Sequence, residues 1–359
     1  MDALLEKDLL PDWILRIGIR ILLRQRLREI TPVTLEDRHE AMAKFLDELR
    51  DAPIALQTDA ANQQHYEVPP EFFLHCLGPN LKYSCGLWSA KTPDLKAAEE
   101  AMLQLTCERA DLHDGQDVLE LGCGWGSLTF WMAHHYPRSR ITAVSNSSAQ
   151  REFILERARE RDLHNIHVIT ADMNDFDTLD RFDRVVSVEM FEHMKNHREL
   201  LRRIAIWLKP EGFLFVHIFV HRSYAYHFTQ RDASDWMSRH FFTGGMMPAD
   251  HQLLHFQEHL VLTHHWRVNG NHYAKTANAW LANMRTSRAK ILPVLAKTYG
   301  NSDVRAWWCR WKIFFLACAE LWRFQNGSEW FVAHYRFVKP SSRSSSSATS
   351  DSSFAVSSS

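Results

Sequence analysis

Apolar and polar residues follow two alternating patterns between residues 117 and 220. Short runs dominated by Val, Ile, Leu and Phe are separated by segments in which apolar residues recur every three or four positions. This alternation predicts an α/β fold, in which helices cover both faces of a mostly parallel sheet. The expected strands are "DVLEL", "RITAVSNS", "IHVITAD", "FDRVVSVEM" and "GFLFVHIFV", and the expected helices span 127–136, 148–162 and 194–208.

Helical periodicity also marks the region before the expected sheet. Residues 8–30 carry Arg16, Arg20, Arg24 and Arg28 at intervals of four, so the expected helix is basic and amphipathic. Its alternatives are packing on the protein or on a homodimer partner, and peripheral contact with a membrane. Further helices are expected over 36–50 and 94–113, with short helices and a loop between them.

The pattern is less regular after residue 220. An insertion rich in His, Trp and Gly is expected over 221–300. Segments 259–284 and 329–339 are expected to return to the sheet as late strands, with antiparallel pairing open to them and helices between. The domain plan is a helical segment 1–50, a helical cap 51–116, a core 117–340 and a disordered Ser-rich tail 341–359.

Composition excludes several classes of protein. The 359 residues hold 42 Lys plus Arg and 43 Asp plus Glu, so no global field recruits nucleic acid. No uncharged apolar run reaches about 18 residues, the length of an ordinary transmembrane helix. The six cysteines lack metal-binding spacing and no signal peptide is expected, which favours reduced thiols in the cytoplasm and no metal site.

The stretch "VLELGCGWGS" suggests a cofactor site. Gly122, Gly124 and Gly126 allow a tight turn, so backbone N–H groups can approach a ligand at the start of the next helix. A dinucleotide site would need G-x-G-x-x-G and a later carboxylate, whereas "AVSNSSAQ" follows here. The form G-x-G-x-G, with Glu120 before it, is typical of class I methyltransferases that use S-adenosyl-L-methionine (SAM).

The third expected strand supports a nucleoside ligand. In "TADMNDF", Asp172 could accept a hydrogen bond from an adenine amino group, and Met173 could cover the ring. The alternative for Asp172 is a helix cap or turn.

The stretch "SVEMFEHMKNH" places Glu189, Glu192 and His193 directly after an apolar strand. Charged groups beside buried strands usually have something to pair with. The alternative is that Glu192 and His193 begin the next helix as a cap and dipole partner.

These blocks, with "QHYEVPPEFF", "LKYSCGLW", "LFVHIFVHRSYAYHF", "FFTGGMMP", "WRVNGNHYAKT" and "NGSEWFVAHYRFVK", resemble coclaurine N-methyltransferase-like enzymes. Those enzymes belong to the cyclopropane-fatty-acid synthase-like superfamily, and the resemblance spans residues 50–339. It implies a class I SAM-dependent methyltransferase with N-terminal helices and an active-site insertion, acting on a small aromatic or heterocyclic amine.

The resemblance also implies roles for particular residues. Glu189, Glu192 and His193 match the family's catalytic cluster. The matched cofactor contacts are Tyr83, Ser84, Glu120, Gly122, Gly124, Asn146, Gln150, Asp172 and Met173.

The lipid-modifying branch of the superfamily leaves a second function open, namely cyclopropane synthesis or C-methylation on an unsaturated acyl chain. Its bicarbonate site matches Cys85, Glu192, His217 and Tyr273 in this chain, although lipid enzymes usually have a small residue where Glu189 stands. The late aromatic residues that could wall a substrate pocket are Phe241, Phe242, Trp266 and Trp330.

The chemistry of amine methylation assigns work to the acidic cluster. An aliphatic ammonium has a pKa near ~10, so a base must remove a proton before nitrogen can attack. We expect Glu189 and Glu192 to attract the ammonium, and His193, partnered by Glu192, to accept its proton. A SAM-binding regulatory protein is a third possibility, disfavoured because this cluster is intact.

Overall fold

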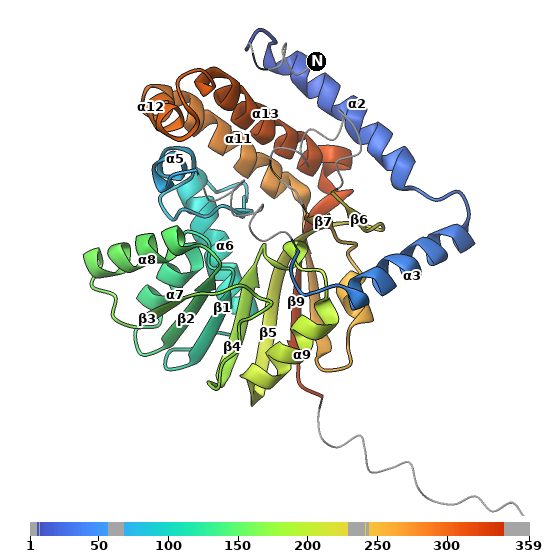
Figure 1. Ribbon diagram of the computed structural model, residues 1–359, viewed down its shortest axis with the longest axis vertical. Helices are drawn as coiled ribbons and strands as arrows, with labels where there is room; N and C mark the ends of the chain where they lie inside the picture. The colour runs from blue at the N-terminus through green and yellow to red at the C-terminus, as the bar shows by residue number, and fades with distance from the viewer. Residues whose placement is uncertain (1–5, 7, 57–67, 229–240, 242–243, 341–359) are drawn as a thin grey trace, which may run out of the picture.

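A seven-stranded sheet forms the centre of the protein (Figure 1). The computed structural model describes residues 6, 8–56, 68–228, 241 and 244–340. The strands follow the order β3-β2-β1-β4-β5-β9-β8 across the sheet. Their bounds are β1 (Asp117–Leu121), β2 (Arg140–Ser145), β3 (Ile166–Thr170), β4 (Phe182–Val188), β5 (Leu208–His221), β8 (Val261–Val268) and β9 (Trp330–Val338).

Neighbouring strands from β3 to β5 pair in parallel, whereas β9 is antiparallel to both β5 and β8. The mostly parallel sheet and its late antiparallel strands are therefore as expected. A separate two-stranded ribbon joins β6 (Tyr226–His227) to β7 (Met246–Met247).

Alternate residues of each strand pack on opposite faces of the sheet. Val118 and Val186 contact the core under α6 and α7, whereas Leu119 and Val185 belong to the core under α9. This follows from the period of two in an extended strand, and each face needs a helical cover. The helices are α2 (Asp12–Ile30), α3 (Leu35–Asp51), α5 (Pro70–Cys76), α6 (Leu95–Arg109), α7 (Ser127–His135), α8 (Ser148–Glu160), α9 (His197–Trp207), α11 (Gly270–Thr286), α12 (Arg288–Tyr299) and α13 (Val304–Arg323), with short turns η1 (Phe191–His193), η2 (Gln252–His255) and η3 (Phe324–Gly327).

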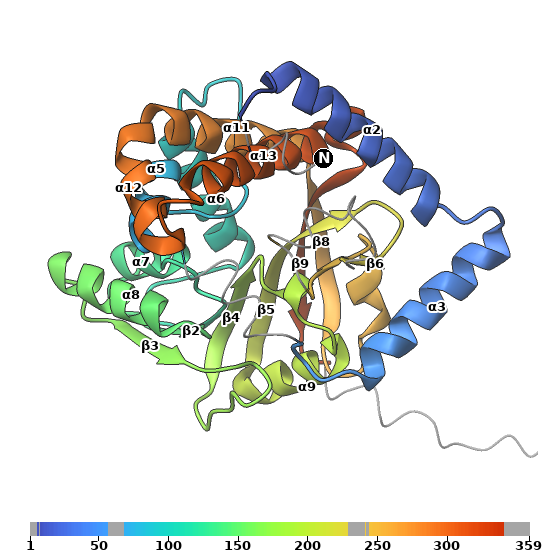
Figure 2. The ribbon, with the colours of Figure 1, turned by 45° about the horizontal axis from the view of Figure 1, so that its top comes forward.

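A layer of helices lies above the sheet in Figures 1 and 2, built from α5, α11, α12 and α13. Its core is aromatic, with Trp280, Trp311 and Phe315 fully buried. Helix α2 docks along α13, because Arg16 and Arg20 both bind the buried carboxylate of Glu320. The loops after β1 and β4 therefore face a roof that comes from both ends of the chain.

One segment differs from the sequence-based expectation. Residues 259–284 were expected to contribute a strand, but the strand ends at Val268 and α11 follows. Asn269 causes the change, because its side chain accepts a hydrogen bond from the Asn271 N–H and caps the helix. Apolar residues then recur at helical spacing through Tyr273, Ala277 and Trp280. Strand β8 lies within 221–300, so part of that region joins the central sheet. The tail 341–359 lies outside the described residues.

Candidate active site

The loop after β1 requires glycine, because its backbone has positive φ and passes close to Met190. Gly122, Gly124 and Gly126 all have positive φ, and a Cβ on Gly122 would come within 2.7 Å of the Met190 side chain. A Cβ on Gly124 would instead point into open space. The loop leads into the N-terminus of α7, so its N–H groups can face an anionic group of a ligand.

Glu120 precedes this loop and is buried. Its carboxylate accepts a 2.5 Å hydrogen bond from the Thr129 hydroxyl. Burial raises the pKa of Glu120 to about 8, even though the Thr129 bond lowers it. A polar ligand bound at the glycine loop would therefore change the pKa of Glu120.

Gln150, at the start of α8, offers an unused donor. Its Oε1 accepts from the Ser145 hydroxyl at 2.6 Å, which fixes the amide orientation. Its Nε2 is buried and has no hydrogen-bond partner among the described residues. A buried donor without a partner is costly, so this amide fits a ligand oxygen at the cofactor site.

Tyr83 and Ser84 lie before α6, next to a lysine that sequence reasoning missed. Lys82 is 2% exposed and its Nζ donates to the Ser84 hydroxyl. Burial lowers the pKa of Lys82, while the charge of Glu189 raises it. This lysine therefore links the cofactor side of the site electrostatically to the acidic cluster.

Glu189 follows β4 with φ near +50°, in the left-handed region that a non-glycine residue rarely adopts. Its Oε2 accepts a 2.6 Å bond from the Tyr273 hydroxyl, and its Oε1 accepts a 3.2 Å bond from the Cys85 N–H. His217 Nε2 lies 3.4 Å from the same Oε1. Burial raises the pKa of Glu189 to about 7, and Lys82 is the strongest influence that lowers it.

Glu192 has the opposite environment, although it lies three residues away in η1. It is 1% exposed, and neither carboxylate oxygen accepts a hydrogen bond from any described residue. Burial and then the charge of Glu189 raise the pKa of Glu192 well above its usual value. The expected pairing of Glu192 with His193 is thus not a hydrogen bond in this structure. Of the two carboxyl groups, Glu189 therefore ionises at the lower pH and Glu192 keeps its proton longer.

His193 completes the cluster. Burial lowers its pKa to about 4, against the opposing effect of Glu189. The imidazole is therefore neutral at physiological pH and has a nitrogen that can accept a proton.

One cavity of about 690 Å³ joins the two sets of residues. Residues expected on the cofactor side and on the acceptor side line it together. Those that line it are Tyr83, Ser84, Glu120, Gly122, Gly124, Gln150, Glu189, Glu192, His193 and Tyr273. The residues expected to hold the methyl acceptor and those expected to hold the methyl donor therefore line the same cavity.

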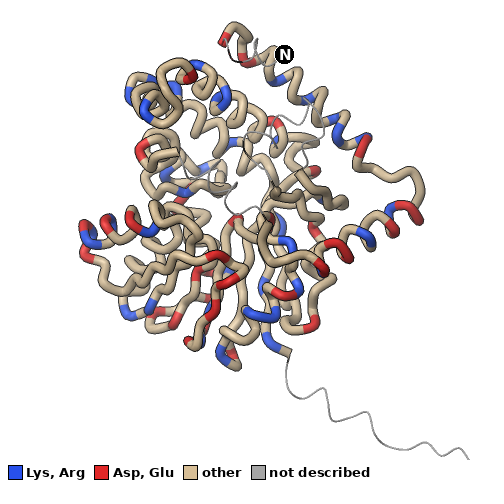
Figure 3. Tube along the Cα trace, viewed as in Figure 1, with Lys and Arg blue, Asp and Glu red and all other residues tan. Residues whose placement is uncertain are grey.

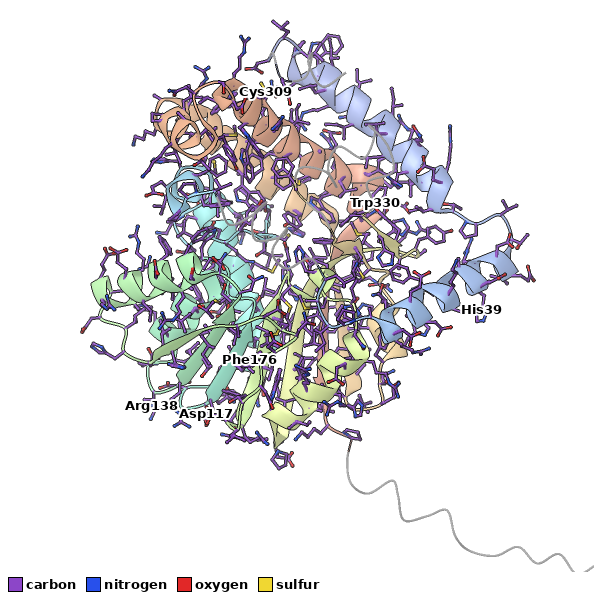
Figure 4. All side chains as sticks on the ribbon, viewed as in Figure 1. His39, Asp117, Arg138, Phe176, Cys309 and Trp330 are labelled. Carbon is purple, nitrogen blue, oxygen red and sulfur yellow. The ribbon has the colours of Figure 1, made fainter. Side chains whose placement is uncertain are left out.

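Other expected site residues do not line this cavity. Asp172 accepts from the Asn174 N–H at 2.7 Å, as a turn residue does, and Met173 packs in the core beneath α9. Trp330 is fully buried where β9 begins (Figure 4).

Cys85 and His217 contact Glu189 but do not line the cavity themselves. The others outside the lining are Asn146 and Trp266, whereas Phe241 is buried against Trp311 and Phe314, and Phe242 lies outside the described residues.

Comparison with known proteins identifies the family. The sequence pattern of the mycolic acid cyclopropane synthetase family matches residues 55–328. The chain belongs to this family. An (S)-coclaurine N-methyltransferase from Thalictrum flavum subsp. glaucum is 38% identical over 93% of this chain and 94% of its own length.

A solved structure and a lipid enzyme complete the comparison. The crystal structure of coclaurine N-methyltransferase bound to N-methylheliamine and SAH has a TM-score of 0.91 at 35% identity, covering 94% of this chain and 98% of that one. The cyclopropane-fatty-acyl-phospholipid synthase of Escherichia coli K12 is more distant, at 29% identity over 77% of this chain and 68% of its own.

These similarities confirm the resemblance, the class I fold and the cofactor. The chain is a coclaurine N-methyltransferase-like, SAM-dependent methyltransferase. Within the described residues, no helix has both the length and the apolar character needed to cross a membrane. The same part of the chain contains no cluster of His, Cys, Asp and Glu arranged for a metal ion.

Proposed function

We propose that this enzyme methylates the nitrogen of a small aromatic or heterocyclic amine. The observation that carries the proposal is a pair of neighbouring carboxylates, the buried Glu192 and the largely buried Glu189, in the cavity that contains the glycine loop. Two neighbouring carboxyl groups in an empty site carry one negative charge between them, because two like charges repel. A cation bound between them allows both groups to ionise. Such a site favours an ammonium over a neutral acceptor.

Binding would begin at Glu189, whose carboxylate is already held by Tyr273 and Cys85. The bound ammonium lowers the cost of ionising Glu192, because a positive charge offsets the burial of a second carboxylate. These contacts direct the nitrogen toward the glycine loop and thereby supply the orientation on which in-line transfer depends.

Proton removal would then fall to His193. The ammonium N–H bond breaks and the proton moves to an imidazole nitrogen, which leaves a lone pair on the amine nitrogen. SAM held at the glycine loop would supply the methyl group: the amine lone pair forms the new nitrogen–carbon bond as the carbon–sulfur bond breaks, and the electron pair of that bond stays on sulfur. The ionised Glu192 stabilises the imidazolium that forms.

The walls of the cavity favour an apolar, aromatic acceptor. Trp280, Phe314 and Trp322 line it from the helical roof, and Trp322 stacks on Tyr273 with ring centroids 4.8 Å apart. Aromatic faces near a cation add attraction of about 0.5–2 kcal/mol. A hydrophobic amine would therefore bind better than a small polar one.

The environment of Glu189 argues against the lipid reaction. Cys85, His217 and Tyr273, which resemble bicarbonate ligands of the lipid branch, surround the carboxylate of Glu189. A side chain of this protein thus fills the position expected for an added anion. We expect turnover to be independent of bicarbonate, and a Glu189→Gly variant to regain part of its turnover when bicarbonate or formate is added.

The test is incubation of the purified enzyme with isotope-labelled SAM. Separate pools of small amines and of unsaturated phospholipid vesicles are then analysed by mass spectrometry. Label in amines supports the proposal. Label only in lipid would replace it with cyclopropane synthesis or C-methylation.

We further propose a cytoplasmic enzyme that contacts an anionic membrane surface through α2. All six cysteines are buried and unpaired, as expected in a reducing compartment. Leu9, which precedes α2, and Trp13 and Ile17 on α2 are 64%, 64% and 47% exposed. The exposed Arg24 and Arg28 follow along the helix. Figure 3 shows basic residues repeated along this helix. Apolar residues beside cations suit an anionic lipid surface.

Cosedimentation with phosphatidylserine vesicles tests this contact, with phosphatidylcholine vesicles and Ile17→Ser as controls. Binding to phosphatidylserine that Ile17→Ser weakens would support it. A homodimer in sedimentation without vesicle binding would assign the exposed side of α2 to a second copy of the chain.

A further inference from the structure

A pair of histidines lies behind the acidic cluster, between β5 and β9. His217 and His334 are directly opposite each other in the antiparallel register, and both are fully buried. His334 Nε2 is 2.9 Å from His217 Nδ1. Burial lowers the pKa of both imidazoles well below the ordinary value, so both rings are neutral. A neutral ring carries one proton, so one nitrogen must donate and the other accept.

Arg109, the last residue of α6, decides where these protons lie. Its Nη1 is 2.7 Å from His334 Nδ1. A guanidinium can only donate, so His334 Nδ1 accepts and the proton of His334 is on Nε2. That proton is donated to His217 Nδ1. The proton of His217 is therefore on Nε2, the nitrogen that faces Glu189.

His217 contacts Glu189 through both its backbone and its ring. The Glu189 N–H donates to the His217 carbonyl at 2.7 Å, which fixes the backbone where β4 ends. His217 Nε2 lies 3.4 Å from Glu189 Oε1. This separation is longer than a good hydrogen bond, so the N–H acts mainly as a dipole directed at the carboxylate. The other tautomer would direct a lone pair at the same oxygen and repel it.

We propose that Arg109 and His334 are positioning residues of the methyl transfer, which act by fixing the tautomer of His217. Arg109 donates to His334 and His334 donates to His217, so the Nε2–H of His217 points at Glu189 and stabilises its ionised carboxylate. Arg109 lies 5.0 Å above the ring of Trp266 on β8, which restrains the guanidinium. The importance of Glu189 for turnover rests on the proposed function, whereas the tautomer of His217 does not.

The first experiment measures the tautomer directly. Long-range nitrogen–proton NMR of the full-length enzyme separates the two tautomers, and His217→Gln and His334→Gln assign the signals. We expect both rings to be protonated on Nε2. A His217 ring protonated on Nδ1, or an even mixture, would overturn the inference. This readout needs no substrate, so it holds even where no amine is methylated and the proposed function fails.

The second experiment changes the donor. Arg109→Met removes it at similar length, and Arg109→Lys keeps one. We expect Arg109→Met to give a mixture of His217 tautomers and about a tenfold lower kcat/KM for the amine, with unchanged SAM affinity. Arg109→Lys should restore the Nε2 tautomer and most of the activity.

A matched control removes an imidazole elsewhere in the sheet. His265 lies on β8, where its Nε2 pairs with Asp250 at 2.9 Å. His265→Gln should leave the His217 signals and turnover unchanged. Equal losses of activity in Arg109→Met and Arg109→Lys, with the His217 tautomer unchanged, would show that Arg109 acts only on packing.

Discussion

Carboxylates at the two ends of the central sheet have opposite environments, and their pKa values shift in opposite directions. At the end where β1 begins, Asp117 binds Arg140 and Lys209, and Asp114 binds Arg138, with the arginines largely exposed. Asp117 and Arg138 are labelled at this end in Figure 4. The hydrogen bond from Arg140 lowers the pKa of Asp117, and that from Arg138 lowers the pKa of Asp114.

At the other end, Glu120 and Glu192 are buried and Glu189 is largely buried, and burial raises the pKa of each. One end places its carboxylates beside water and exposed cations, whereas the other removes them from water and leaves the Glu192 carboxylate without a hydrogen bond among the described residues. Burying a carboxylate costs free energy, and a ligand that binds in the cavity can reduce that cost. We therefore assign the carboxylates at the cavity to ligand binding and catalysis, and the exposed ones to solubility.

The largest effect should come from replacing a carboxylate at the cavity. Glu189→Gln keeps the size of the side chain but removes the charge that attracts the ammonium, so turnover of the amine should fall about a hundredfold or more. SAM affinity, measured by calorimetry, should change less than twofold. Glu192→Gln and His193→Ala should behave alike.

Glu211→Gln is the control, because Glu211 is exposed near the opposite end of β5. It should leave turnover unchanged. Wild-type turnover in all three cavity variants would remove the catalytic assignment.

A smaller effect is expected from two glycines with similar backbone geometry at opposite ends of β1. Gly122 has φ +80° and a Cβ there would meet Met190, whereas Gly115 has φ +94° and open space. Gly122→Ala should weaken SAM binding about tenfold or more. Gly115→Ala should cost only backbone strain, of about 1 kcal/mol, and leave SAM binding intact. Similar SAM affinity in both variants would contradict the loop assignment.

The two ends should also differ in how pH affects stability. Glu120 has a folded pKa of about 8, above the unfolded value near ~4.3, so the folded state retains a proton that the unfolded state has lost. Stability therefore falls as pH rises through this window, and Glu120→Gln should remove that fall.

The folded pKa of Asp117 is depressed, so its stabilisation is present above the unfolded pKa near ~3.9 and is lost in stronger acid. Asp117→Asn should therefore destabilise at pH ~7 and much less at pH ~2–3. Thermal unfolding across pH measures both variants. Parallel pH profiles would show that the two carboxylates share one environment.

The smallest effect should come from Arg138→Ala. The side chain of Arg138 is 80% exposed, and surface ion pairs add little to stability. We expect a change in melting temperature of at most about 2 °C and no change in turnover. A marked loss of either would mean that the exposed ion pairs do more than maintain solubility.

Sequence could predict the parts of the site that are local in the chain. The glycine spacing after β1 and the cluster of Glu189, Glu192 and His193 each occupy a few consecutive residues beside an apolar strand. In a parallel sheet such segments gather at the carboxyl ends of the strands. The mostly parallel sheet and the helices on both of its faces follow from the same alternation, whereas the order of the strands across the sheet was not predicted.

Other parts were inaccessible because they depend on distant contacts between common residue types. Arg109 and His334 are separated by 225 positions, and neither belongs to a motif. Lys82 directly precedes "YSCG" in the sequence, but its electrostatic effect on Glu189 follows only from its burial in the folded structure. The helix after β8 had one overlooked signal, the capping Asn269 before Gly270.

The joining of α2 to α13 has a consequence for how the protein folds. Arg16 and Glu320 are 304 positions apart, so their ion pair closes a loop that spans most of the sequence. Contacts of such separation form late, after the locally paired strands. Until then the aromatic lining of the unroofed cavity is exposed to water and to other chains. We therefore expect the cavity to close late in folding, and slower docking of α2 to cause aggregation before it causes loss of the sheet.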